Sequence, residues 1–147
     1  MRRNGGFTLV ELTAVMIIVA ILAVFVTAAF DHRVFSTATF AEEVKAQLAY
    51  GRKAAIAARR AVIVRVAADN VSLSICPNTP VCGADMPLAS PTGEAAFIAT
   101  APSGVSLVAL PAFSFNAEGV PTSQVIVTVN GAQTHTITIE QGTGYVH

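Results

Sequence analysis

The sequence has no tryptophan, only two cysteines and few charged residues, which make up 12% of its 147 residues. Lysine and arginine together number 9, as do aspartate and glutamate, so the formal net charge is zero. This balance gives no whole-protein argument for nucleic acid or an anionic membrane surface as a partner. Apolar residues make up 53%, which is too many for a disordered chain. A chain of this length predicts a single globular domain.

Sequence motifs of enzymes are missing as well. There is no Gly-x-Ser-x-Gly elbow, no phosphate-binding loop and no paired-histidine zinc motif. The three histidines, His32, His135 and His147, are scattered along the chain. We therefore expect no enzymatic activity, no cofactor and no metal.

Much of the apolar excess lies in one run without proline, residues 7–30. As a helix this run would be about 36 Å long, enough to cross a hydrocarbon core of about 30 Å. Arg2 and Arg3 precede it and favour a cytoplasmic N-terminus. The rest of the chain would then lie outside the inner membrane, in the periplasm of a Gram-negative cell.

Three interpretations of the apolar run compete. It could be a cleaved secretory signal, with a passable cleavage site at residues 26–28, a plain one-pass anchor, or the assembly helix of a prepilin. Glu11 favours the third interpretation, because a carboxylate within an apolar run costs about 2.5 kcal/mol or more at mid-membrane. A signal peptide has no use for such a residue.

The segment Gly6-Phe-Thr-Leu-Val-Glu-Leu12 resembles the processing and methylation motif of type IV pilins and type II secretion pseudopilins. The resemblance implies that a membrane prepilin peptidase cuts between Gly6 and Phe7, and that the new N-terminal Phe7 is N-methylated. It also implies partners: membrane lipid, other pilins in a filament, and an inner-membrane assembly platform with its ATPase. Glu11 would then pair with the terminal amine of a neighbouring subunit, which removes much of the cost of both charges in lipid.

An amphipathic helix is expected over residues 31–60, where Phe40, Val44 and Leu48 repeat every four residues. The pilin resemblance implies one long helix through both segments. The sequence from Thr39 to Glu42 nevertheless fits a capping box, which predicts a fresh helix start there.

From residue 61 the period becomes two and β-branched residues dominate. Candidate strands are residues 61–67, 71–76, 95–100, 105–109, 112–116, 123–130 and 133–140, with a short end piece at 144–147. Hairpin turns are predicted at Asp69-Asn70 and, as type I′, at Asn130-Gly131. The proline-rich run 76–91 is predicted to be a loop. A helix followed by strands indicates an α+β fold, with a long N-terminal helix packed on an antiparallel β domain.

The predicted organisation is therefore a cleaved leader (1–6), a transmembrane assembly helix (7–30), its amphipathic continuation (31–60) and a periplasmic antiparallel β domain (61–147). This order resembles the GspH/FimT branch of the pilin superfamily, which includes minor pilins of MSHA-type pili. The resemblance implies a minor subunit of a type II secretion pseudopilus or of a type IV pilus, and it leaves the choice between the two open.

Cys76 and Cys82 lie close together in the proline-rich loop. In an oxidising periplasm a disulfide between them is favoured, and it would stabilise the fold by about 2 kcal/mol in the chain-entropy model. A metal site and two free thiols are the alternatives. No histidine or carboxylate lies between the two cysteines to complete a metal site.

One group of basic residues could contact a phosphate backbone, as a DNA-uptake pilin would require: Arg52, Lys53, Arg59, Arg60 and Arg65. A helical wheel spreads the first four over more than one face. Some FimT-type proteins resemble DNA-uptake pilins whose C-terminus carries arginines, whereas this chain has none after Arg65. We favour a solvated helix end, and keep a DNA-binding minor pilin and an ordinary membrane-anchored or secreted β domain as alternatives.

Overall fold

The computed structural model describes residues 8–29, 32–77 and 84–147 of the chain. These residues form two compact units, Met1–His32 and Arg33–His147. The predicted leader, Phe7 and Phe30, and Cys82 lie outside the described residues.

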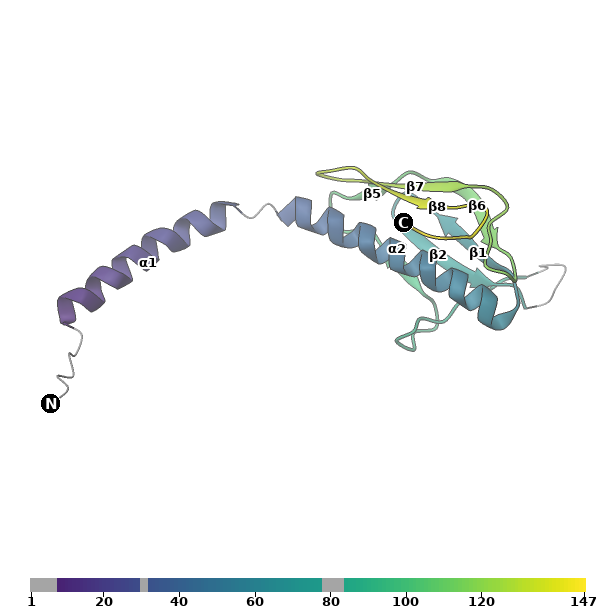
Figure 1. Ribbon diagram of the computed structural model, residues 1–147, viewed down its shortest axis with the longest axis horizontal. Coiled ribbons are helices and arrows are strands. Elements are labelled where there is room, and N and C mark those ends of the chain that lie inside the picture. Colours follow the sequence, from purple (N-terminus) through teal and green to yellow (C-terminus); the bar gives the residue numbers. More distant parts are fainter. Residues whose placement is uncertain (1–7, 30–31, 78–83) are drawn as a thin grey trace. The chain divides into compact units, whose positions relative to one another are not determined.

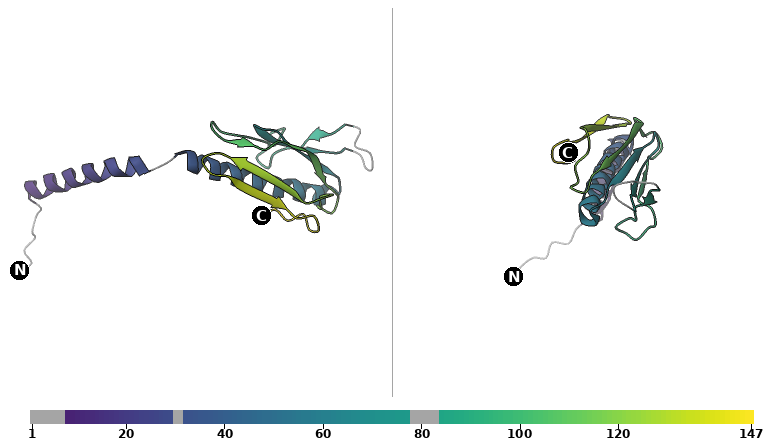
Figure 2. Two further views of the ribbon diagram at one scale, coloured as in Figure 1. Left: turned by 90° about the horizontal axis from the view of Figure 1, so that it is seen from above. Right: turned by 90° about the vertical axis from the view of Figure 1, so that its right-hand side faces the viewer.

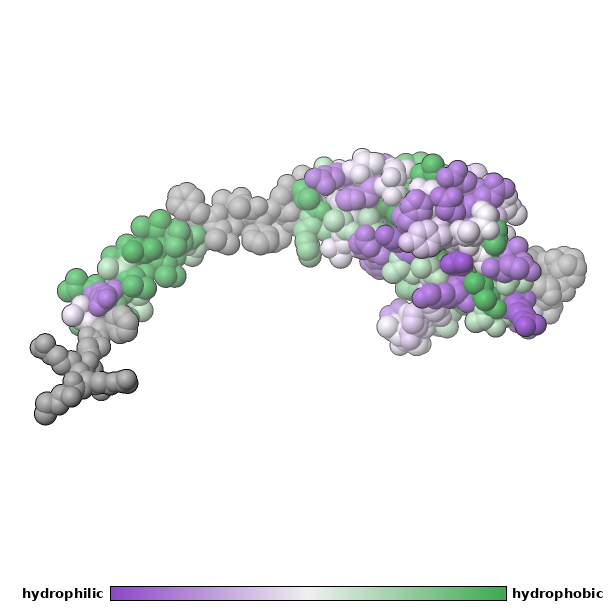
Figure 3. Space-filling model, viewed as in Figure 1, coloured by the Kyte–Doolittle hydropathy of each residue, from purple (hydrophilic) through white to green (hydrophobic). Residues whose placement is uncertain are grey.

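Nearly all of the described part of the first unit is one helix, α1 (Leu9–Ala29). Its sequence contains neither glycine nor proline, so nothing interrupts the backbone ladder. The side chains of residues 8–23 are all exposed, and apart from Thr8, Glu11 and Thr13 they are apolar, on every side of the helix rather than along one stripe. In the view of Figure 3, most of the described part of this helix is coloured as hydrophobic, with a polar patch near its start. A helix that is apolar all round needs an apolar environment, either other protein or lipid.

Helix α2 (His32–Ala58), of 27 residues, belongs to the second unit except for its first residue, His32. The predicted fresh start at Thr39 is wrong, because the helix runs through that residue. A tertiary contact stabilises the turns of α2 that precede Thr39. Thr37 is fully buried, and its hydroxyl accepts a hydrogen bond from the backbone N–H of Ala132 at 3.3 Å. At the other end Arg59 takes a left-handed conformation (φ 50°), and the N–H of Arg60 donates to the carbonyl of Ala55, which closes the helix.

Two antiparallel sheets follow. The larger has the order β3-β2-β1-β6, with β4 also paired to β2, and the smaller has the order β5-β7-β8. Their strands are β1 (Val62–Val66), β2 (Asn70–Ile75), β3 (Met86–Pro87), β4 (Ile98–Thr100), β5 (Ser106–Leu107), β6 (Leu110–Phe115), β7 (Val125–Asn130) and β8 (His135–Ile139). Each predicted strand run therefore overlaps a strand, although β2 begins one residue and β6 two residues before the predicted start. The loop prediction for residues 76–91 is wrong at β3, because Met86 pairs with Ile75 across the edge of β2.

The predicted hairpin between β1 and β2 is confirmed, since Val66 pairs with Val71 and the N–H of Ala67 donates to the carbonyl of Asn70. The second predicted hairpin, between β7 and β8, is present, but the prediction of a type I′ turn is wrong. Val129 pairs with His135, which leaves a connection longer than two residues, and neither Asn130 nor Gly131 has a positive φ. The end piece pairs as predicted, with Val146 bridged to Ile139.

The core lies between α2 and the two sheets. Figures 1 and 2 show that both sheets lie against this helix. Apolar side chains of α2, including Phe40, Val44 and Leu48, pack with inward-facing residues of both sheets. Gln47 is fully buried among them, and its Nε2 donates to the carbonyls of Val71 and Phe97 at 3.1 and 2.9 Å. The fold is α+β, as predicted.

Candidate functional site

Helix α1 begins with a side-chain cap. The backbone N–H of Glu11 donates to the hydroxyl oxygen of Thr8 at 3.3 Å, and the N–H of Leu12 donates to the carbonyl of Thr8 at 3.1 Å. Thr8 is therefore the N-cap and Glu11 the third residue of the helix. This is the spacing of a capping box, a pattern visible in the sequence as Thr-x-x-Glu that the sequence interpretation of Glu11 missed.

Glu11 is an exposed carboxylate in the first turn of an otherwise apolar helix. The apolar side chains of the preceding residues Leu9 and Val10 are 78% and 74% exposed, so the helix surface near the Glu11 carboxylate is apolar. The partial positive charge of a helix N-terminus stabilises a carboxylate there by about 0.3–1 kcal/mol. That is less than the cost of about 2.5 kcal/mol or more for a charge within lipid, so the helix end alone does not compensate it. Gly6 and Phe7, the predicted cleavage and methylation residues, lie outside the described residues.

Among the residues that the structure describes, no helix is sufficiently long and apolar to cross a membrane.

Cys76 follows the end of β2, is buried and is disulfide-bonded. Its N–H donates to the carbonyl of Ala61 at 3.0 Å, which fixes the start of the proline-rich segment beside β1. Because Cys82 lies outside the described residues, the Cys76–Cys82 pairing stays a prediction.

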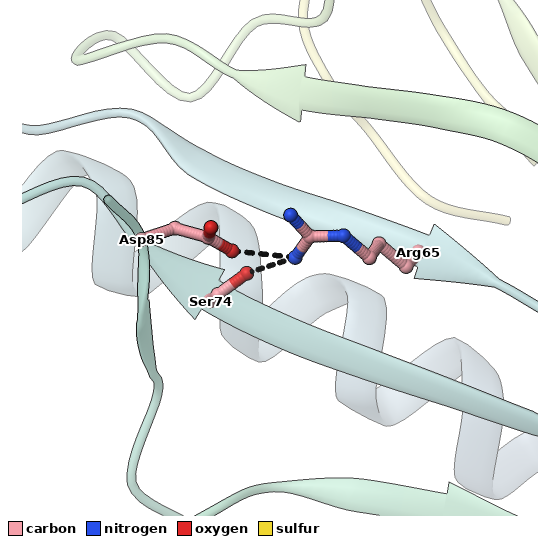
Figure 4. Close-up of polar contacts among 3 residues, drawn as sticks. All are labelled: Arg65, Ser74 and Asp85. Atoms are coloured by element: carbon pink, nitrogen blue, oxygen red, sulfur yellow. Dashed lines mark hydrogen bonds and ion pairs between the residues drawn. The ribbon is translucent and has the colours of Figure 1, made fainter. Parts of the chain in front are cut away.

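A polar cluster that the sequence did not predict lies on the larger sheet. Arg65 of β1 donates through Nη1 to Ser74 of β2 at 2.6 Å and to the Asp85 carboxylate at 2.5 Å, as Figure 4 shows. The hydrogen bond from Arg65, and after it the nearby Ser74 hydroxyl, lowers the pKa of Asp85 to about 2. Asp85 is followed at once by β3, so the ion pair ties the end of the proline-rich segment to the sheet.

The basic residues that suggested a DNA-binding surface do not act as one group. Arg65 is engaged with Asp85 on the sheet. Arg52 is half-buried on α2, with its Nε enclosed by protein. Lys53, Arg59 and Arg60 are exposed at the C-terminal end of α2. The structure thus leaves three exposed cations of the original five at the helix end.

The described histidines do not form a site together. His147 lies 3.1 Å from the Glu140 carboxylate and stacks on Tyr145, whereas His135 belongs to β8. Within the described ranges, no three histidine, cysteine, aspartate or glutamate side chains are grouped so that they could hold a metal ion.

Known proteins share the N-terminal motif and the fold. The prokaryotic N-terminal methylation motif matches residues 1–27. The type IV minor pilin FimU of Pseudomonas aeruginosa has a similar structure, with a TM-score of 0.54 and 18% identity over 74% of this chain and 84% of FimU. The minor pseudopilin EpsH of the Vibrio cholerae type 2 secretion system matches with a TM-score of 0.57 and 12% identity, over 73% of this chain and 90% of EpsH. No protein of curated function matches the chain in sequence.

The motif and the fold together make this chain type IV pilin-like. The motif covers the start of α1 with Thr8 and Glu11, and the fold is the pilin arrangement of a helix on antiparallel sheets.

Proposed function

We propose that this pilin-like chain is a minor pilin or minor pseudopilin, a non-enzymatic subunit that assembles into a filament through its N-terminal helix. The system is either a type II secretion pseudopilus or a type IV pilus of the MSHA kind. Structural neighbours of both kinds support the proposal at this level, since one is a minor pilin and the other a minor pseudopilin.

The observation that carries the proposal is the exposed Glu11 carboxylate in the first turn of a helix that is apolar on all sides. Such a helix is stable when surrounded by lipid or by like helices, and a carboxylate in that environment needs a cation. Cleavage between Gly6 and Phe7 would create that cation as a new terminal amine. The amine of one subunit would pair with Glu11 of its neighbour.

Before assembly the subunit would lie in the inner membrane, with residues 7–30 in lipid and the second unit in the periplasm. Its partners there would be the prepilin peptidase, which removes residues 1–6, and the assembly platform with its ATPase. The methylation motif at residues 1–27 supports this location. An oxidising periplasm also suits the disulfide that we propose between Cys76 and Cys82.

Glu11→Gln and Glu11→Asp form a matched pair that separates charge from helix capping. Glutamine can still complete a capping box but carries no charge, whereas aspartate keeps the charge. If pairing with an amine is the role of Glu11, Gln should lower incorporation into filaments roughly 70-fold, which corresponds to about 2.5 kcal/mol. The Glu11→Asp variant should retain most of the wild-type incorporation. Incorporation is measured by immunoblotting sheared filaments against the membrane fraction.

Normal incorporation of the Gln variant would show that Glu11 only caps the helix. Mass spectrometry of the mature N-terminus is the companion measurement. A methylated Phe7 at the start of the chain supports processing by a prepilin peptidase, and an intact residue 1–6 segment in assembled material would contradict it. An ordinary membrane-anchored β domain would keep residues 1–6 and would stay in the membrane fraction.

A further inference from the structure

An apolar groove lies on the second unit where α2 begins. It has a volume of about 330 Å³. One wall comes from Phe35, Thr39 and Glu43, which follow one another at four residues and therefore lie along one side of α2. The other wall comes from Thr100 and Pro102, at the end of β4 and just after it. The groove thus joins two parts of the second unit that are far apart in the sequence.

The core holds this groove in place, whereas its rim is exposed. Phe40 also lines the groove, is 2% exposed and packs with the core. Between the two residues of the other wall, the N–H of Ala101 donates to the carbonyl of Asp69 at 2.8 Å. Phe35, by contrast, is 72% exposed. A large aromatic ring therefore lies in water beside a fixed apolar surface, and an apolar partner that covers it is favoured.

Chain connectivity keeps Phe35 close to α1, whatever the relation between the two units. Three steps of the chain lead from Ala29, the last residue of α1, to His32, the first of α2, and they span at most about 11 Å. Phe35 follows three residues later, roughly 5 Å along α2. Its backbone therefore lies within roughly 16 Å of the end of α1. Among the described residues of the second unit, Phe35 is the large exposed apolar side chain that is nearest to α1 along the chain.

The lipid around α1 is the partner that this tether favours. The headgroup layer of a bilayer extends about 5–7 Å beyond each side of the hydrocarbon core, and interfacial segments bury aromatic side chains there. Glu43 is the only charged side chain among the described residues that line the groove, and it lies eight residues, or roughly 12 Å, beyond Phe35. A carboxylate there suits a zwitterionic headgroup with an ammonium group and repels an anionic headgroup.

We propose that this groove binds the membrane surface beside α1, with the Phe35 ring among the upper parts of the acyl chains and Glu43 at the ammonium groups of zwitterionic lipids. The inference rests on the proposed function, because it needs α1 in a bilayer. The contact holds the second unit of the unassembled subunit against the membrane. Because a subunit that enters a filament loses this contact, the contact also favours the membrane-bound state.

Tryptophan fluorescence can locate the contact, because the chain has no tryptophan of its own. The full chain is reconstituted into vesicles of phosphatidylethanolamine and phosphatidylcholine whose acyl chains carry bromine, which quenches tryptophan only at close range. Four variants each carry one tryptophan: V19W in α1, F35W at the groove, S103W next to the Pro102 wall, and M86W in β3. We expect bromine to quench V19W, F35W and S103W and to leave the emission of M86W unchanged.

S103W and M86W form the matched pair. Both positions are exposed, and neither is close to α1 along the chain. Ser103 adjoins the groove, whereas Met86 pairs with Ile75, which lines a separate pocket with Ala57 and Ala58 at the other end of α2. Quenching of S103W but not of M86W therefore reports the groove itself, and not the mere nearness of the second unit to the membrane.

Two further changes in the S103W chain test the parts of the contact. F35S should lower the ratio of docked to undocked molecules about tenfold, the effect of removing a buried aromatic ring, whereas F35L should preserve most of the quenching. Phosphatidylglycerol in place of phosphatidylethanolamine should reduce the quenching, and E43Q should remove that difference. Unchanged quenching in F35S would overturn the role of Phe35, and equal quenching in the two lipids that of Glu43.

The other outcomes separate this contact from the proposed function. Quenching of V19W and F35W without S103W would overturn the groove contact and leave the proposed function intact. Equal quenching of S103W and M86W would do the same, because the second unit would then have no preferred face toward lipid. Emission of S103W that depends on the protein-to-lipid ratio and not on bromine would assign the groove to a second copy of the chain and overturn a lipid partner. An unquenched V19W would show that α1 is not in lipid, and both proposals would fail.

Discussion

At the scale of single residues, Asp85 shows how a chain position with no recognisable motif acquires a defined role. Its carboxylate accepts a hydrogen bond from Arg65, which also donates to Ser74. The three residues come from β1, β2 and the segment before β3, and only the antiparallel pairing of β1 with β2 brings Arg65 near Ser74. Glu11 could be recognised from its local sequence, whereas the partner of Asp85 lies 20 residues away and depends on the fold.

The Arg65–Asp85 pair predicts an acid-dependent loss of stability. An ordinary aspartate has a pKa of about 3.9, and in the folded chain the pKa of Asp85 falls to about 2. Folding thus favours the charged carboxylate, so its contribution is complete above about pH 4 and is lost as the pH falls toward 2. In thermal unfolding of the full chain in detergent, the wild type should have a higher melting temperature than the Asp85→Asn variant at pH 6. The two melting temperatures should converge near pH 2.

The difference at pH 6 should be small, because the Arg65 side chain is 48% exposed and solvent screens the pair. Asparagine preserves the shape of the side chain, which limits the comparison to charge. A difference in melting temperature that stays constant from pH 6 to pH 2 would contradict the assignment.

At the scale of elements, two sequence predictions failed at one contact. The strand runs were predictable, because alternation of buried and exposed side chains reflects a sheet with one face on the core. The start of α2 and the turn after β7 were not, since both depend on Thr37 meeting the hairpin at Gly131 and Ala132. Local patterns at Thr39 and Asn130-Gly131 contain no information about a partner roughly 95 residues away.

The contact between Gly131 and Thr37 predicts that a single methyl group added at Gly131 lowers the stability of the chain strongly. A Cβ added to Gly131 would lie 2.2 Å from the Thr37 hydroxyl oxygen, and Thr37 is fully buried and cannot move aside. Gly131→Ala should therefore destabilise the chain by about 1–3 kcal/mol, as overpacking does. Urea unfolding measures the change.

Thr37→Ala removes the two closest atoms and serves as the second arm of a double-mutant cycle. Because the alanine Cβ stays in place, part of the clash remains. The double variant should nevertheless lose less stability than the sum of the two single variants. Strict additivity would mean that Gly131 and Thr37 do not touch in solution, and the explanation for the longer α2 would then fail.

At the scale of the whole molecule, the two units differ in how they are stabilised. All of the buried core residues that the structure describes come from the second unit, between Phe40 and Val146. The described side chains of α1 are exposed and add nothing to that core. The proposed division of labour follows from this: one unit supplies an apolar helix and a carboxylate for assembly, and the other supplies a folded domain with its own surface.

Independent stability of the second unit is the prediction at this scale. Removal of residues 1–32 deletes none of the core residues that the structure describes and leaves the Thr37 contact, Gln47 and both sheets in place. The remaining residues 33–147 should fold in detergent-free buffer and unfold in one cooperative transition. The calorimetric enthalpy should be about 80 kcal/mol near 60 °C, the value for a domain of about 115 residues. A broad transition with strong dye binding would instead indicate that the second unit needs α1 to fold, and the separation of assembly from folding would then be wrong.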